Sequence, residues 1–289
     1  MTTALSSVAG GTWRRGLLAV AVAWVMLVAT GAQAQQTVVC NWSSDTLLLV
    51  DLSTGERTVL AGPSVGTGDS LTSLGAVVQE ASGTLIVSGA AGTFWRVDPA
   101  TGDRTVVSSS SVGAGETTSG VFGLVVEADG TIVASSGWEA EILRIDPTTG
   151  DRTVIASATI GSGATFSSTW QILINTDGTI IYLDASQGVL GQIDPSTLER
   201  TVISSASVGS GVAFQSAMYG VTRLPDGDYA VASNTDTDPS IIRVDPDTGD
   251  RTALSGDTVG WATLSAPGMR WGWIPVAHST LRTLATVPS

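Results

Sequence analysis

The fold of this chain is decided by Val97-Asp98-Pro99-Ala100-Thr101-Gly102-Asp103-Arg104-Thr105, a nine-residue stretch that occurs in five related copies. The aspartates at the second position of the copies are spaced 47, 48, 48 and 51 residues apart, at Asp51, Asp98, Asp146, Asp194 and Asp245. A period of this length is typical of propellers and solenoids, in which each repeat is one supersecondary unit. The unit of this fold is therefore a repeat of about 48 residues.

Each repeat carries two further markers. One is a Ser/Thr-Val/Ile-Gly step, at residues 64–66, 111–113, 159–161, 207–209 and 258–260. The other is a tight turn, at Ser82-Gly83, Asp129-Gly130, Asp177-Gly178 and Asp226-Gly227. Short β-rich runs lie between the markers, so each repeat is predicted to form four antiparallel strands. In the third repeat these runs are residues 123–127, 131–135, 141–145 and 152–156.

The turn between the last two strands of the third repeat is Asp146-Pro147-Thr148-Thr149-Gly150. Asp146 is expected to accept backbone N–H bonds, Pro147 to preset φ, and Gly150 to supply a positive φ. The same chemistry recurs in every copy of the nine-residue stretch, so we expect one turn type throughout.

The predicted fold class is all-β, a propeller of four-stranded antiparallel blades. No segment after the N-terminal region has a sustained 3.6-residue apolar period, so helices should be minor. A four-stranded sheet cannot bury both faces alone, and radial stacking around a channel solves this problem. A linear solenoid is the competing arrangement, and six blades are the alternative to five.

The five-blade count depends on how the two ends of the propeller meet. Residues 37–40, 47–50 and 57–60 match the second, third and fourth strands of a repeat, and the first strand is lacking. Residues 271–276 could supply it, so this C-terminal strand is predicted to join the N-terminal blade and close the ring.

The first 34 residues are interpreted as an export signal, with Arg14 and Arg15 before an apolar stretch and cleavage after Ala34. The apolar stretch, residues 16–30, is shorter than the ~20 residues of a spanning helix, although an uncleaved anchor is an alternative. The propeller is assigned to residues 35–278 and a tail to residues 279–289. We expect a secreted or periplasmic monomer, exported by the Sec route, with the twin-arginine route as the alternative.

The charge of the chain limits which binding partners are plausible, and its cysteine content limits which disulfides can form. The chain has 13 basic residues, all of them arginine, and 26 acidic ones. Nucleic acid and anionic membranes are therefore poor partners. Cys40 is the only cysteine, so no internal disulfide can form, and a buried strand position is expected for it.

Eight arginines recur at fixed positions of the repeat. One set follows an acid and is predicted to form salt-bridged or solvated hairpin edges, at Arg57, Arg104, Arg152, Arg200 and Arg251. A second set occupies another recurrent position, at Arg96, Arg144 and Arg243. Recurrence in the repeat indicates a structural role for both sets.

Residues 220–234, Gly-Val-Thr-Arg-Leu-Pro-Asp-Gly-Asp-Tyr-Ala-Val-Ala-Ser-Asn, followed by residues 241–245, resemble the NHL-type and gluconolactonase-like (strictosidine synthase-like) propeller repeat. The resemblance spans nearly the whole chain after the signal. It implies a propeller, and such propellers serve as lactonases, lyases, ligand sensors and protein-binding scaffolds. A gluconolactonase-like enzyme would hold a divalent cation with Glu, Asn and Asp side chains, but the acidic ligand at the start of a first strand has no match here.

Residues that depart from the repeat are the candidates for a site. His278 is the only histidine and lysine is absent, so no catalytic residue is predicted. The connections between second and third strands vary, and variable loops at a channel mouth are usual binding positions. The predicted ligand-binding residues are Trp42, Trp138, Gln171, Asp184 and Asn234, with Trp170 on the same face. Packing of the indoles between blades is the alternative for the tryptophans.

Two functions are consistent with these residues. The first is an exported, non-catalytic propeller that binds a small molecule, glycan or protein through its variable face, without a cofactor. The alternative is a lactonase or hydrolase dependent on Ca²⁺ or another divalent cation, with Asp184, Asn41, Asn234 and Gln171 as oxygen ligands. Gln171 is notable because other repeats have Gly75, Gly123 and Gly220 at its position.

Overall fold

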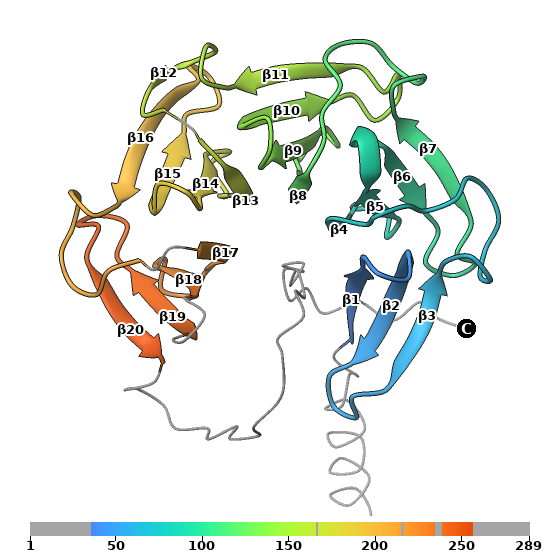
Figure 1. The fold of residues 1–289 in the computed structure, drawn as a ribbon, viewed down its shortest axis with the longest axis horizontal. Coiled ribbons are helices and arrows are strands. Elements are labelled where there is room, and N and C mark those ends of the chain that lie inside the picture. Colours follow the sequence, from blue (N-terminus) through green and yellow to red (C-terminus); the bar gives the residue numbers. More distant parts are fainter. Residues whose placement is uncertain (1–35, 166, 215–216, 235–238, 257–289) are drawn as a thin grey trace, which may run out of the picture.

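The chain forms five antiparallel sheets arranged in a ring, as Figure 1 shows for the computed structural model. The structure describes residues 36–256 except 166, 215–216 and 235–238. The all-β class and the five blades of a propeller are thereby confirmed. Residues 1–34, the predicted closing strand at residues 271–276, His278 and the tail lie outside the described residues. Within the described ranges, no helix is both long and apolar enough to cross a membrane.

The strands follow the repeat closely. The first sheet contains β1 (Gln36–Asn41), β2 (Thr46–Asp51) and β3 (Arg57–Ala61). The second contains β4 (Val77–Gln79), β5 (Leu85–Ser88), β6 (Phe94–Val97) and β7 (Arg104–Ser108), with a 3₁₀ turn η1 (Ala90–Gly92). The third contains β8 (Val121–Val126), β9 (Ile132–Ser136), β10 (Glu141–Ile145) and β11 (Arg152–Ala156).

The fourth sheet contains β13 (Thr169–Ile174), β14 (Ile180–Asp184), β15 (Val189–Ile193) and β16 (Glu199–Ser204). A two-residue strand, β12 (Ser162–Gly163), pairs in parallel with the start of β16. The fifth contains β17 (Ala217–Arg223), β18 (Tyr229–Asn234), β19 (Pro239–Val244) and β20 (Arg251–Ser255). The first sheet shows three strands, as predicted, and the other sheets follow the predicted order of four.

The core lies between neighbouring sheets and not inside any one of them. Four hydrophobic clusters each combine residues of two consecutive sheets. In β14, Ile180 and Tyr182 belong to the cluster shared with the third sheet, whereas Ile181 and Leu183 belong to the cluster shared with the fifth. Because side chains of a strand alternate between faces, one continuous apolar run serves two interfaces. This explains why the middle strands show no alternation of apolar and polar residues.

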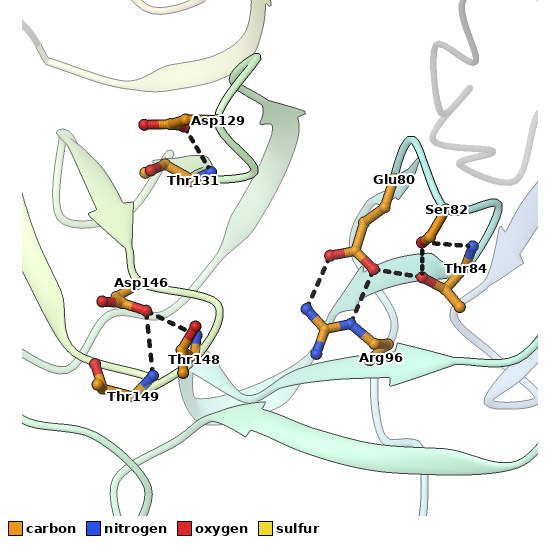
Figure 2. Close-up of polar contacts among 9 residues, drawn as sticks. All are labelled: Glu80, Ser82, Thr84, Arg96, Asp129, Thr131, Asp146, Thr148 and Thr149. Carbon is orange, nitrogen blue, oxygen red and sulfur yellow. Dashed lines mark hydrogen bonds and ion pairs between the residues drawn. The ribbon is translucent and has the colours of Figure 1, made fainter.

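Carboxylates hold the turns between first and second strands and between third and fourth strands. Figure 2 shows the first of these turns in the second sheet and both turns of the third sheet. Asp146 Oδ1 accepts the N–H groups of Thr148 (2.7 Å) and Thr149 (3.2 Å), and Gly150 has a φ of 77°. Asp129 Oδ1 accepts the N–H of Thr131 at 2.9 Å. The turn chemistry predicted for Asp146 and Gly150 is confirmed.

The second set of recurrent arginines ties the third strand of a sheet to the first hairpin. Arg96 donates through Nε and Nη2 to the two carboxylate oxygens of Glu80, both at 2.8 Å (Figure 2). Arg144 pairs with Glu127 in the same way, and Arg243 pairs with Asp226 and Asp228. The structural role predicted for this set is confirmed.

The prediction for the first set of arginines is wrong in four of its five members. Arg104, Arg152, Arg200 and Arg251 are buried, with exposures of 8%, 6%, 4% and 5%. Their guanidinium groups donate to backbone carbonyls of the loop that leaves the preceding sheet. Arg57 alone is exposed. These four arginines therefore have the structural role that their recurrence predicts, but their guanidinium groups bind backbone carbonyl oxygens rather than a neighbouring acid.

We call each such contact a latch: the outer hairpin of one sheet holding the Ser/Thr-Val/Ile-Gly loop of the sheet before it. Arg152 Nη1 donates to the carbonyls of Ser109 (2.9 Å) and Val112 (3.1 Å), and Nε donates to Glu116 O (2.8 Å). The adjacent Asp151 accepts the N–H of Ala114 at 2.7 Å. The outermost strands β3, β7, β11 and β16 run along the perimeter toward the next sheet, which brings loop and hairpin together (Figure 1).

The latch depends on glycine where two backbones touch. Gly113 and Gly115 have φ of 79° and 95°, and a Cβ on either would lie about 2.0 Å from a carbonyl oxygen of the next sheet. No side chain fits at that distance, so the two glycines of the loop are steric requirements of the joint.

Cys40 occupies the buried strand position that was predicted for it. It is 2% exposed within the cluster between the first two sheets, and burial raises the pKa of its thiol to about 12. We expect no alkylation of Cys40 by iodoacetamide at pH 8 in the folded protein, because the thiolate is the reactive species and the sulfur is covered. Mass spectrometry should find full labelling only after denaturation, and rapid native labelling would contradict this packing.

Candidate ligand-binding site

A β-bulge in the inner strand of three sheets places an aromatic ring at the same position of the repeat. The register shifts between Val121 and Gly123, between Thr169 and Gln171, and between Met218 and Gly220. The residues skipped by the pairing are Phe122, Trp170 and Tyr219. A bulged residue leaves the alternation of its strand and can direct its side chain to a new position, a device common next to active sites.

These rings form a continuous array with two exposed tryptophans. Phe122 stacks on Trp170, with centroids 4.7 Å apart, and Trp170 meets Tyr219 edge to face at 5.8 Å. Trp42, which follows β1, lies nearly parallel to Phe122 at 6.5 Å, and Trp138 lies edge-on to Phe122 at 6.2 Å. The aromatic array, Trp42, Phe122, Trp138, Trp170 and Tyr219, thus draws residues from the first, third, fourth and fifth sheets.

Glycines fix the positions of the rings. A Cβ on Gly120, whose φ is 59°, would lie 2.5 Å from the indole of Trp138, so the indole rests directly on this backbone. A Cβ on Gly137 would lie 3.3 Å from the rings of Phe122 and Trp170, a tight but less severe approach. Trp138 is nevertheless 65% exposed, and Trp42 is 43% exposed. One side of the Trp138 indole is therefore held by backbone while most of its surface faces solvent.

Carboxylates lie beside Trp138. Glu139 accepts the hydroxyls of Ser119 and Ser136, each at 2.5 Å, and the N–H of Ser119 at 3.3 Å. Burial acts to raise the pKa of Glu139, but these hydrogen bonds outweigh it and lower the pKa below its ordinary value. Glu139 is thus held as an anion at neutral pH.

The pKa of Glu141 is shifted in the opposite direction, above its ordinary value. Burial is the main cause that raises its pKa, and the nearby charges of Glu139 and Glu116 add to it. Its Oε1 atom is buried without a hydrogen-bond partner among the described residues. The array is therefore bordered by acidic groups whose charge is not balanced locally.

The arginines of the described part are engaged away from this array. Four are in the latches, three are in ion pairs at the turn end of the sheets, Arg57 lies on an outer hairpin and Arg223 donates to Gly227 O. Among the described residues, the charged side chains that lie next to Trp138 in the chain are therefore acidic.

Asp184 has a local structural partner for each oxygen. It is fully buried and accepts from Ser167 N (2.6 Å), Ser186 Oγ (3.0 Å), Gln187 N (3.1 Å) and Gln187 Nε2 (3.1 Å), among other donors. These bonds tie the β14–β15 connection to the loop before β13. Asp184 therefore organises the loops behind Trp170 and does not present its carboxylate to solvent.

The remaining predicted residues are separated. Gln171 is buried at the position held by glycine in the second, third and fifth sheets, next to Trp170 rather than among the exposed rings. Asn41 caps its own turn, accepting Ser43 N at 3.1 Å. Asn234 ends β18, with its backbone opposite Ala217 and Pro239. Of the five predicted ligand-binding residues, the structure brings Trp42 and Trp138 into one array.

The described residues contain no group of three or more His, Cys, Asp and Glu side chains placed to hold a metal ion. The proposed ligand set Asp184, Asn41, Asn234 and Gln171 includes one acid, whose oxygens are already hydrogen-bonded. The metal-dependent alternative stays a prediction that these contacts do not favour.

Phe122 and Tyr219 were missed in the sequence. Their signal was present, because the residue before Gly75, Gly123, Gln171 and Gly220 is large in each repeat. The second sheet has Leu74 there, which is fully buried in the cluster between the first two sheets. The bulge decides whether this residue is core or surface, and periodicity alone does not reveal it.

Comparison with known proteins places the chain by fold. No protein-family model and no curated protein matches the chain. A chain in the crystal structure of a nidogen/laminin complex matches with a TM-score of 0.58 at 12% identity, covering 77% of this chain and 75% of that one. The likeness is one of fold. Virginiamycin B lyase from Staphylococcus aureus matches with a TM-score of 0.53 at 14% identity, covering 77% and 67%.

A nutrient-binding propeller matches equally well. The auxiliary nutrient binding protein from Bacteroides thetaiotaomicron VPI-5482 has a TM-score of 0.54 at 12% identity, covering 76% of this chain. The matched region spans 54% of that protein. Propellers with binding and with lyase functions therefore share this architecture, and the site must decide between them.

Proposed function

We propose that this protein is an exported binding protein that takes up its ligand on the aromatic array. The observation that carries this proposal is Trp138, an indole seated on Gly120 and left 65% exposed at the edge of four further rings. An exposed aromatic side chain that the backbone already holds in place has little conformational freedom left to lose on binding. Binding-protein neighbours of the same fold support the proposal.

The array fits a ligand with a flat face and no negative charge. Sugar rings and aromatic rings stack on indole, and a cation over an indole gains further attraction from the ring electrons. The unbalanced carboxylates around Glu139 and Glu141 favour a neutral or cationic ligand and disfavour an anion. We expect neutral oligosaccharides or aromatic amines to bind, and aromatic carboxylates not to bind.

Calorimetry with neutral oligosaccharides, aromatic amines and matched aromatic carboxylates tests this assignment. Trp138→Ala should weaken binding of the best probe about tenfold or more, since a stacked ring contributes about 1–3 kcal/mol. Leu254→Ala removes an exposed apolar side chain, 42% exposed, from the outer strand β20, outside the aromatic array, and should leave affinity unchanged. Equal affinities for wild type and Trp138→Ala, or preference for the carboxylates, would contradict the proposal.

A further inference from the structure

Three rings of the aromatic array stand as the walls of a corner. Trp42 and Phe122 are nearly parallel, with 14° between their planes and 6.5 Å between their centroids. Trp138 stands at 74° to Phe122, with centroids 6.2 Å apart. Trp42 and Trp138 are both exposed, and Phe122 is partly exposed. We call these three residues the aromatic corner, in which aromatic surface faces a ligand from more than one direction.

A carboxylate is fixed beside the Trp138 wall of the aromatic corner. The indole of Trp138 rests on Gly120, and the residue before this glycine, Ser119, donates its N–H and its hydroxyl to Glu139. The third donor to the carboxylate is the hydroxyl of Ser136. All three donors are uncharged. They hold the carboxylate in place without neutralising its negative charge.

The aromatic corner can attract a cation but offers it few hydrogen-bond acceptors. A cation within about 6 Å of a ring centroid is attracted by the electrons of the ring face. A primary ammonium would exchange its hydrogen bonds with water for acceptors of the protein. The oxygens of Glu139 already accept three bonds, and the Oε1 atom of Glu141, which has no partner among the described residues, is buried. A quaternary ammonium has no N–H group to satisfy, and its methyl groups can pack against the rings.

We propose that the aromatic corner binds the quaternary ammonium group of a small cation such as choline. The three rings contact its methyl groups, and Glu139 supplies the nearby opposite charge. This inference rests on the proposed function, because it assigns a ligand class to the same array. A zwitterion such as betaine carries a carboxylate as well, so repulsion from Glu139 should weaken its binding relative to choline.

Calorimetric titration with choline and with its neutral tert-butyl analogue, in which carbon replaces the nitrogen, tests the role of the charge. The two probes have the same shape, so the difference in affinity measures the attraction of the rings and of Glu139 for a cation. Choline should bind about tenfold more tightly than the analogue, because attractions from several rings add together. Betaine should bind more weakly than choline.

A lipid headgroup is a second source of the same chemical group. Phosphatidylcholine vesicles present it next to a phosphate, whose negative charge would lie beside Glu139. We therefore expect free choline to bind and the protein not to sediment with these vesicles. Sedimentation with the vesicles, together with binding of choline, would support recognition of the same group with a lipid as its source.

Substitutions connect this selectivity to the aromatic corner. Trp138→Leu keeps an apolar side chain without ring electrons and should weaken choline binding about tenfold, whereas Trp138→Phe should retain most of the affinity. Glu139→Gln should weaken choline binding about threefold or more and leave the neutral analogue unaffected. Glu56→Gln makes the same change of charge on the exposed outer hairpin of the first sheet and should alter neither affinity.

Equal affinities for choline and the neutral analogue would overturn the proposal, and so would choline binding that Trp138→Leu leaves unchanged. The oligosaccharides and aromatic amines test the proposed function separately. If one of them binds and Trp138→Ala weakens it while choline does not bind, the array is a ligand site but not one for quaternary ammonium. If no probe of either set binds, both the proposed function and this inference are wrong.

Discussion

Replacing Arg152 with alanine is expected to lower the free energy of unfolding by about 3–5 kcal/mol. Arg152 is 6% exposed, and its guanidinium donates to Ser108 Oγ as well as to the carbonyls of the preceding loop. Alanine would leave these oxygens buried without a donor, and the cost of an unsatisfied buried group exceeds the net gain of making its hydrogen bond. The latch between the second and third sheets would lose the hydrogen bonds that Arg152 donates to the preceding loop.

Urea unfolding monitored by tryptophan fluorescence would measure this loss. Arg152→Lys keeps the charge but lacks the planar fork that reaches several carbonyls, so it should recover only a part of the stability. Arg223→Ala, at an exposed position, should change the free energy of unfolding by less than about 0.5 kcal/mol. An Arg152→Ala protein as stable as Arg223→Ala would show that the latch contributes little.

The second large effect is expected for Gly115→Ala. Gly115 and Gly130 have the same φ of 95°, but a Cβ on Gly115 would lie 2.0 Å from Arg152 O, whereas a Cβ on Gly130 would meet nothing within 4 Å. Gly130→Ala therefore measures the cost of the left-handed conformation alone, about 1–2 kcal/mol. Gly115→Ala adds a backbone clash and should cost at least about 3 kcal/mol in total.

Thermal unfolding of the two alanine variants separates the cost of the steric clash from the cost of the left-handed backbone conformation. Since both glycines belong to the loops of the third sheet or its latch, the two proteins report on the same neighbourhood. Equal losses of stability would mean that the loop moves away from Arg152 without cost and that the joint is not tightly packed.

Much of the fold follows from the repeat itself. The spacing of Asp51, Asp98, Asp146, Asp194 and Asp245 predicts five units, and turn residues such as Asp146 and Gly150 predict where hairpins lie. These features are local, because a carboxylate and a glycine determine a turn within five residues. In the third sheet, β10 and β11 have the predicted bounds, and β8 and β9 differ from the predicted strands by one or two residues at their ends.

The site was less predictable because its determinants are not local. The acid before Arg152 suggested a surface ion pair, yet the arginine reaches back to carbonyls about 40 residues earlier in the chain. The bulge at Phe122 arises from the pairing of β8 with β9 and places a nominal core residue in the array. Trp42 and Trp138 were singled out because they fall at loop or strand-end positions on the variable face, and they contact the same ring, Phe122. Asp184 departs from the repeat for a structural reason.

The direction of the latches has a consequence for how the protein is made. Each hairpin holds a loop that lies earlier in the chain, as Arg104 holds Val65 and Arg152 holds Val112. When the chain emerges N-terminus first, the loop of each sheet can therefore be bound as soon as the outer hairpin of the next sheet has formed. The C-terminus is not needed for this step. Assembly in chain order keeps the apolar sheet faces covered during synthesis, when exposed faces and edges would otherwise aggregate.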